Sequence, residues 1–165
     1  MDKPLVIGIG EVLWDLLPKG KKLGGAPVNF AYHAHAIGAQ GVVVSSVGSD
    51  DLGNEIRSAL EKRRLETSFL QTHSKLPTGT VSVDLDSSGV PQYVINENVA
   101  WDAVNWEEDL TELARAADAV CFGTLAQRSF ITRSTIHAFL QHTSDECLRI
   151  FDLNLRQSYY SPAII

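Results

Sequence analysis

The stretch Leu5-Val6-Ile7-Gly8-Ile9-Gly10, close to the N-terminus, is a short apolar run that ends in glycine. Such a run, without polar alternation, is typical of a strand that is buried on both faces of a sheet. Val42–Val47, Ala119–Phe122 and Leu148–Leu153 repeat the pattern. Segments with apolar residues at helical spacing lie between these runs. This order of strand and helix predicts an α/β fold with a mostly parallel sheet and helices on both faces.

The predicted helices are recognised by their first residues and by their spacing. Pro27 suits the first turn of a helix, where its missing N–H costs nothing, and Gly38 is the expected end of that helix. Asp50 and Asp51 supply caps for the next one. The apolar residues that carry the helical spacing farther along are Ile56, Ala59, Leu60 and Leu65; Leu110, Leu113, Ala114 and Ala117; and Ile136, Phe139 and Leu140.

The alternation of strand and helix is interrupted twice. Glu11–Leu17 mixes acidic with large apolar residues and stops at Pro18-Lys19-Gly20, so we expect an extended excursion that ends in a turn. Thr80–Leu85 alternates polar and apolar residues, and a turn at Asp86–Gly89 would lead it into Gln92–Ile95. This pattern predicts a β-hairpin with one exposed face.

Composition and charge exclude several classes of protein. The chain has 165 residues, of which 44% are apolar, and its net charge of −6 repels phosphate backbones and anionic lipid, so we expect neither nucleic acid nor membrane as a partner. No apolar stretch has the length of a signal peptide or a membrane span, and we expect a cytoplasmic protein. Cys121 and Cys147 lack the spacing of a metal site, so we expect reduced thiols in the core and no metal.

The candidate site residues directly follow the predicted strands, because ligands of open α/β sheets bind beyond the carboxyl ends of the strands. Asp15 lies between Trp14 and Leu16. A carboxylate in such apolar surroundings needs strong donors, and adjacent sugar hydroxyls would supply them. A helix cap or a salt bridge is the alternative interpretation of Asp15.

In Gly24–Asn29, small residues directly precede the predicted start of a helix. Gly24 and Gly25 would let a ligand approach the backbone, and the free N–H groups at the start of the helix would bind its oxygen atoms. The amide of Asn29 can both donate and accept, which matches a hydroxyl. A tight loop before the helix and an exposed first-turn asparagine are the alternatives.

Polar residues also alternate at the end of the last predicted strand. If the chain stays extended there, Asp152, Asn154 and Arg156 point to one side. Arg156 could clamp a phosphate, because guanidinium geometry matches phosphoryl oxygens. A structural ion pair between Arg156 and Asp152 is the alternative. Gln127, which follows another predicted strand, is a further candidate.

Other signals of catalysis are absent from the sequence. Leu13 stands where a dinucleotide fingerprint needs its third glycine, and Gly20-Lys21-Lys22 is not a Walker loop. Ser45 and Ser46 do not form a nucleophile elbow. The residues therefore support neither dinucleotide binding nor a hydrolase.

Short motifs follow one another over nearly the whole chain. They are Gly10–Asp15, Leu23–Ala31, Val47–Gly53, Pro77–Thr80, Val99–Asp102, Cys121–Arg128 and Phe151–Arg156. Together they resemble the PfkB (ribokinase-like) carbohydrate kinases and are most similar to the fructokinase branch. The resemblance implies a Rossmann-like ribokinase fold with a small β lid, formed by segments near residues 11–23 and 78–98. Such lids often pair two subunits, so a homodimer through the lid is expected.

The resemblance also implies ATP-dependent phosphorylation of a sugar hydroxyl, with the sugar held between lid and sheet. Carried over by motif, Asp15 would grip sugar hydroxyls, and Arg156 would be the catalytic residue that faces the sugar or the transferring phosphate. The further substrate-binding residues that the resemblance implies are Gly24, Gly25, Asn29, Trp101 and Gln127.

Kinases of this family place the catalytic base, an aspartate in a Gly-Ala-Gly-Asp stretch, in their C-terminal half. This sequence contains no such stretch. We therefore expect residues 1–165 to form the N-terminal part of one sugar-kinase domain of roughly twice this length, and to be inactive alone. ATP, Mg²⁺ and a monovalent cation such as K⁺ would be bound mainly by the remaining part.

Two alternatives to fructose phosphorylation stay open. The first keeps the family and replaces fructose by a riboside or a 2-keto-3-deoxy sugar acid, with Trp14, Tyr93 and Asn98 among the deciding residues. The second is a non-catalytic sugar-binding or dimerisation module.

Overall fold

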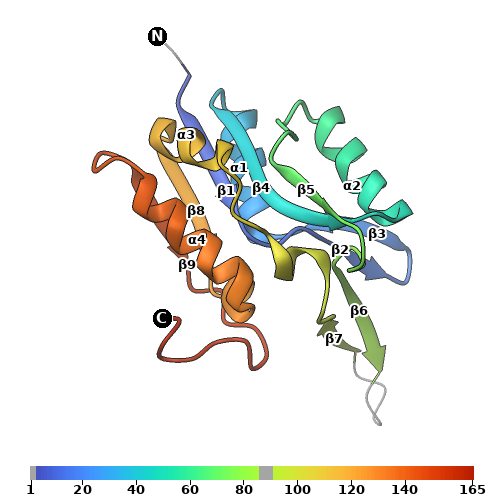
Figure 1. Ribbon diagram of the computed structural model, residues 1–165. Helices are drawn as coiled ribbons and strands as arrows, with labels where there is room; N and C mark the ends of the chain where they lie inside the picture. Colours follow the sequence, from blue (N-terminus) through green and yellow to red (C-terminus); the bar gives the residue numbers. More distant parts are fainter. Residues whose placement is uncertain (1–2, 86–90) are drawn as a thin grey trace.

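The computed structural model describes residues 3–85 and 91–165, so the turn predicted at Asp86–Gly89 lies outside the described residues. Within these residues, the larger sheet has five parallel strands in the order β5-β4-β1-β8-β9 (Figure 1). The strands are β1 (Leu5–Ile9), β4 (Gln40–Gly48), β5 (Leu70–His73), β8 (Ala119–Gly123) and β9 (Leu148–Asp152). Ile7 pairs with Val42 on one side and Val120 on the other, so the apolar stretch near the N-terminus forms the central strand.

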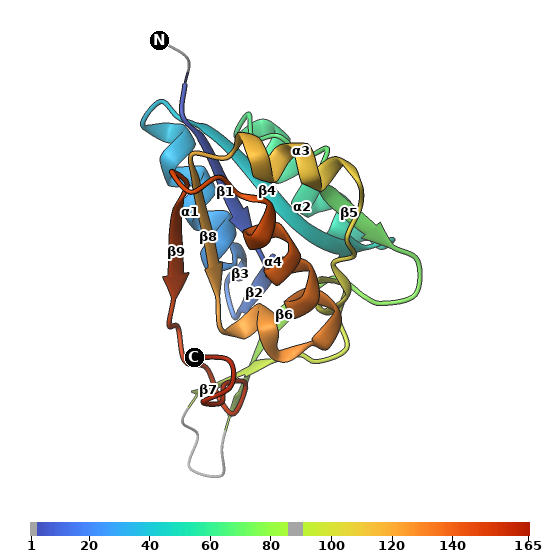
Figure 2. The same ribbon diagram turned by 60° about the vertical axis from the view of Figure 1, so that its left-hand side comes forward.

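Helices cover both faces of this sheet, as the sequence predicted. The α-helices that the structure describes are α1 (Ala26–Ala36), α2 (Asp51–Lys62), α3 (Asp109–Ala116) and α4 (Phe130–His142). Successive side chains of a strand point to opposite faces. Val42 and Val44 therefore pack in one core with α3 and α4, and Val43 packs in the other with α1 and α2 (Figure 2). Among the described residues, none of the helices has both the length and the apolarity to cross a bilayer.

The extended excursion and the β-hairpin together form a second, mixed sheet. Its strands are β2 (Leu13–Leu17), β3 (Gly20–Gly24), β6 (Thr80–Leu85) and β7 (Pro91–Ile95), in the order β3-β2-β6-β7. β2 runs antiparallel to β3 and parallel to β6, with Trp14 paired to Leu23 and Thr80. β6 and β7 are antiparallel. This sheet stands at the carboxyl ends of the strands of the larger sheet, where ligands of α/β proteins bind (Figure 1).

The structure departs from the sequence-based expectation in a few elements. β3 and β5 were not predicted, because Gly20–Gly24 is dominated by exposed glycine and lysine and Leu70–His73 is very short. The helix expected to continue to Leu65 ends at Lys62, because Arg64 adopts a left-handed φ of 60°. Leu65 nevertheless reaches the core, where only 4% of it is exposed.

Both cysteines are free and buried, as expected. Burial raises the pKa of the Cys121 thiol to about 12. Cys121 is therefore protonated at neutral pH and behaves as a small apolar core residue.

Candidate functional site

A cavity of about 790 Å³ lies between the second sheet and the carboxyl ends of β1, β8 and β9. Its wall combines the second sheet, the start of α1 and the segments that follow β8 and β9. Five of the residues predicted from the sequence line this one cavity: Asp15, Gly24, Gly25, Asn29 and Arg156. The fold thus brings together candidates from both ends of the chain.

Asp15 lies on β2, and its side chain belongs to the cavity wall. Among the residues that the structure describes, no cation comes within 4 Å of its carboxylate, so the salt-bridge alternative does not apply. Burial raises the pKa of Asp15, and the guanidinium of Arg156 opposes that rise. The carboxylate is therefore a partly desolvated acceptor that faces open space, which suits hydrogen bonds from a ligand's hydroxyl groups.

Gly24 leaves the room that the Asp15 carboxylate occupies. A Cβ at Gly24 would lie 2.7 Å from Oδ2 of Asp15 and 2.9 Å from Cδ1 of Leu13. Real Cβ atoms do not approach other atoms so closely, and a side chain here would push Asp15 away. Gly24 therefore sets the position of the carboxylate.

Gly25 forms the tight connection between β3 and α1. It has a positive φ of 116°, which favours glycine, and an added Cβ would lie 2.3 Å from the carbonyl oxygen of Glu11. One turn into α1, Asn29 donates its backbone N–H to Gly25 at 3.0 Å and keeps its side chain exposed at the cavity. The amide of Asn29 is thus free to meet a ligand.

Arg156 comes from the segment after β9 and is exposed at the cavity. The alternative ion pair with Asp152 is not formed, since no contact within 4 Å joins these two described residues. Asn154 lines the cavity as well, whereas Asp152 does not. Of the three polar residues that were expected to point to one side, Asn154 and Arg156 line the cavity and Asp152 does not.

Glu11 is a cavity residue that sequence reasoning missed. Only 2% of it is exposed, its Oε1 accepts the backbone N–H of Ala26 at 3.1 Å, and its Oε2 has no partner among the described residues. Burial raises the pKa of Glu11 to about 7. A single acidic residue after an apolar strand forms no recognisable motif. Only the tertiary structure shows that Glu11 is buried at the cavity and binds the start of α1.

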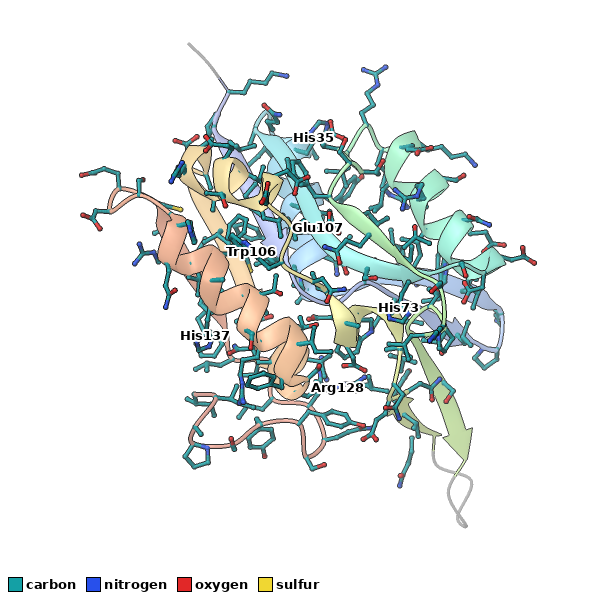
Figure 3. All side chains as sticks on the ribbon, viewed as in Figure 1. His35, His73, Trp106, Glu107, Arg128 and His137 are labelled. Atoms are coloured by element: carbon teal, nitrogen blue, oxygen red, sulfur yellow. The ribbon has the colours of Figure 1, made fainter. Side chains whose placement is uncertain are left out.

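The structure places the other two candidates away from the cavity. Gln127 is buried, donates from Nε2 to the carbonyl oxygen of Gly123 at 2.9 Å, and lies 3.3 Å from His137 on α4 (Figure 3). Trp101 is completely buried in the core. Neither belongs to the residues that line the cavity.

No group of three or more His, Cys, Asp or Glu residues within residues 3–85 and 91–165 is arranged to hold a metal ion. The donor set that Mg²⁺ prefers, several oxygen ligands around one point, is therefore not assembled by these residues. We assign none of these residues to a metal ion.

Comparison with known proteins identifies a family. The model of the pfkB family of carbohydrate kinases matches residues 19–163. An uncharacterized sugar kinase of Pyrococcus horikoshii is 27% identical in an alignment of length 163 that covers 92% of this chain and 52% of the relative. A fructokinase of Klebsiella pneumoniae is 29% identical in an alignment of length 138 that covers 81% of this chain and 45% of that enzyme.

Solved structures show the same architecture. The Pyrococcus horikoshii sugar kinase superposes with a TM-score of 0.78 over 92% of this chain and 53% of that one, and it has also been solved in complex with ATP. The fructokinase of Vibrio cholerae O395, solved with fructose, ADP and calcium ion, is 20% identical, with a TM-score of 0.73 over 96% of this chain and 53% of that one. The chain spans about half the length of the relatives that it matches.

Proposed function

The chain belongs to the pfkB family of carbohydrate kinases, and from this premise we propose that the complete gene product transfers a phosphoryl group from ATP to a sugar hydroxyl. Fructose is the first candidate, because two of the similar proteins described above are fructokinases. The observation that carries the proposal is the shared cavity, in which the Asp15 carboxylate and the Arg156 guanidinium face the same space.

In this proposal Asp15 accepts hydrogen bonds from two sugar hydroxyls. Its partly desolvated carboxylate gains more from such charge-assisted bonds than a fully hydrated one would. Gly24 leaves the carboxylate its place, and Asn29 donates and accepts at a further hydroxyl. These residues bind and orient the sugar, and none of them removes a proton.

Arg156 stabilises negative charge that develops during the reaction. An arginine beside the reacting hydroxyl can stabilise the negative charge on the phosphoryl oxygens as the group is transferred. It also favours the ionised form of Asp15, because a nearby guanidinium lowers the pKa of a carboxyl. We assign the base that deprotonates the hydroxyl to chain beyond Ile165.

The same part of the gene product would hold ATP and its metal. Bound Mg²⁺, with a monovalent cation such as K⁺ nearby, would neutralise charge on the phosphates. Two features support chain beyond Ile165: the relatives are about twice as long, and β9 lies at the edge of the described sheet with 61% of Leu148 exposed. The 165 residues alone should therefore show no turnover, and a coupled assay that finds about 1–100 s⁻¹ with fructose would contradict this division of labour.

A coupled assay of ADP release tests the function. The complete gene product is offered fructose, a riboside and 2-keto-3-deoxygluconate, and we expect the highest kcat/KM with fructose. If one of the other two is preferred, the family assignment stands and the substrate changes. Turnover with none of them, in a product that binds sugar, would favour a non-catalytic sugar-binding module.

The Asp15→Ala variant tests the site itself. Loss of two charge-assisted hydrogen bonds should lower kcat/KM for the sugar by about 10² or more. Asp145→Ala, which removes an exposed carboxylate in the turn after α4, is the matched control and should leave kcat/KM unchanged. Equal kinetics of wild type and D15A would remove Asp15 from the site.

A further inference from the structure

Arg128 lies between the N-terminal end of α4 and the segment that follows β9 (Figure 3). It does not belong to the residues that line the cavity. Only 8% of its side chain is exposed. Its Nε donates to Oδ1 of Asp102 at 2.8 Å, and its Nη2 donates to Oδ2 of Asp102 at 2.8 Å. This is the two-pronged geometry that a guanidinium, and not a lysine, makes with a carboxylate.

Two aromatic rings enclose the same guanidinium. Its central carbon lies 3.9 Å from the ring centre of Trp101 and 4.6 Å from that of Tyr159. A cation over an aromatic face is attracted by the ring, more strongly when water is excluded. Tyr159 belongs to the segment after β9, so Arg128 binds that segment to the core.

The second sheet is joined to the same point. Nη2 of Arg128 also donates to the carbonyl oxygen of Asn96, directly after β7, at 2.7 Å. The hydroxyl of Tyr159 donates to Oε1 of Glu97 at 2.8 Å, and it lies 3.3 Å from the carbonyl oxygen of Ile95. The side-chain amide of Gln157 donates to the carbonyl oxygen of Tyr93 at 2.9 Å. The segment 156–159 is therefore fastened to β7 on one side and to Arg128 on the other.

Arg128 does not line the cavity, but through these contacts it can act on Arg156, which does. Arg156 is exposed, and among the described residues no carboxylate lies within 4 Å of its guanidinium. What fixes it is its backbone, whose carbonyl oxygen accepts the N–H of Tyr159 at 3.1 Å. Tyr159 is in turn held by Arg128. We propose that Arg128 is a positioning residue that holds Arg156 at the wall of the cavity.

The positioning itself can be tested without any ligand. In the complete gene product, Arg128→Met removes the hydrogen bonds and the charge over both rings. We expect amide hydrogen exchange of Tyr159 to become at least about tenfold faster, because local opening of its segment becomes easier. Exchange in β1 and in α2 should not change.

Arg57→Met is the matched control for this experiment. Arg57 on α2 also holds two distant carbonyl oxygens, those of Thr67 at 3.1 Å and Leu70 at 2.7 Å, but it has no contact with the segment after β9. R57M should leave the exchange of Tyr159 at the wild-type rate. Unchanged exchange in R128M, or the same acceleration in R57M, would overturn the proposal.

A double-variant cycle tests whether Arg128 acts through Arg156, and this step rests on the proposed function. The kcat for phosphorylation of fructose is measured for wild type, R128M, Arg156→Met and the double variant. R128M and R156M should each lower kcat by about tenfold, and the double variant should be no slower than R156M. An additional tenfold loss on adding R128M to R156M would show that Arg128 does not act through Arg156.

The two proposals fail in different ways. A wild-type protein that binds no fructose contradicts the proposed substrate, while the exchange of Tyr159 still decides the role of Arg128. If R128M does not fold, Tyr159→Leu and Tyr159→Phe take its place, because both lose the hydroxyl contacts of Tyr159 and only Y159L also loses the ring over the guanidinium. Y159L should loosen the segment 156–159 more than Y159F does, without affecting β1, and equal exchange in the two variants would count against the proposal.

Discussion

Gly24 and Asp15 form a pair in which the smaller residue decides where the larger one lies. A methyl group at Gly24 would lie 2.7 Å from the Asp15 carboxylate, so one of the two must move. The side chain of Asp15 is the softer of the two, because it faces the open cavity and not the packed core.

Gly24→Ala should therefore weaken sugar binding, with KM raised by about tenfold, and it should also lower the melting temperature, because the added methyl group would lie 2.9 Å from Cδ1 of the buried Leu13. Gly123→Ala is the matched control, because its Cβ would lie at an ordinary 3.4 Å from the nearest atom, the carbonyl oxygen of Asp152. Steady-state kinetics on the complete gene product distinguish the two. A G24A enzyme with wild-type KM would show that the position of the Asp15 carboxylate is not set by Gly24.

Glu11 makes the stability of the protein depend on pH. Its pKa is about 7 in the folded chain against 4.5 without burial, so the folded state binds more protons between these values. The free energy of unfolding should fall as the pH rises through this window. The loss amounts to about 3 kcal/mol from below pH 4.5 to above pH 7.

Glu11→Gln should remove this dependence, because the neutral amide keeps an oxygen for the N–H of Ala26 and carries no charge to bury. Urea unfolding at pH 5 and pH 8 measures the effect as the difference between wild type and variant. Glu61→Gln, at an exposed position of α2, should follow the wild type. Parallel pH profiles of wild type and E11Q would contradict the buried, charge-sensitive role.

At the scale of elements, Asp50 fastens α2, β4 and the start of the second sheet at one point. Its Oδ1 accepts the N–H of Gly53 at 2.8 Å and the hydroxyl of Thr78 at 2.6 Å, and its Oδ2 accepts the N–H of Thr78 at 2.8 Å. The hydroxyl of Thr78 in turn accepts the N–H of Gly48, the last residue of β4. Asp50 is therefore more than the helix cap that the sequence predicts.

Asp50→Ala should lower the free energy of unfolding by about 1–3 kcal/mol, the cost of a lost cap and of unpaired polar groups. Partial burial alone would raise the pKa of Asp50, but the hydrogen bonds from Thr78 and Gly53 outweigh it and leave the pKa below 3.8. The contribution of Asp50 to the free energy of unfolding is therefore present above pH 3.8. It is lost as the pH falls through the lower pKa that Asp50 has in the folded state. Ser49→Ala, one exposed residue earlier, is the control; equal midpoints of D50A and S49A in urea would refute the role.

For the molecule as a whole, the second sheet projects from the larger sheet and presents a face that the cavity does not use (Figure 1). Leu13, Asp15 and Leu17 of β2 line the cavity, so Leu16 points the other way, and 37% of it is exposed. We propose that this sheet pairs two copies of the complete gene product. A second copy that packs on this face would remove Leu16 from water.

Light scattering coupled to size exclusion should give the mass of a dimer at micromolar concentration. Leu16→Asp, which places a charge on the proposed contact face, should shift the protein towards the monomer with little change in melting temperature. Ile37→Asp, at an exposed apolar position directly after α1, is the matched control and should leave the mass unchanged. A monomeric wild type, or a dimer that L16D leaves intact, would contradict pairing through this sheet.

The sequence alone determined those strands and helices in which apolar residues form a continuous run or recur at helical spacing. The apolar runs of β1, β4, β8 and β9 and the spacing in the helices follow from which side chains must leave water, and that is a local property. It also indicated Asp15, Gly24 and Arg156, because each lies in a segment that comes after a predicted strand, where ligands of α/β sheets bind. β3 escaped prediction since its lysines face solvent and leave no apolar pattern.

Only the tertiary structure decided which distant residues meet. It brought Arg156 to the cavity of Asp15, left Trp101 and Gln127 in the interior, buried Glu11 against the start of α1 and enclosed Arg128 between two rings. None of these neighbours is set by spacing along the chain, because each pair comes from elements that only packing brings together. The electrostatic and hydrogen-bond energies of a buried charge or guanidinium depend on those tertiary neighbours. They therefore cannot be deduced from a local sequence pattern.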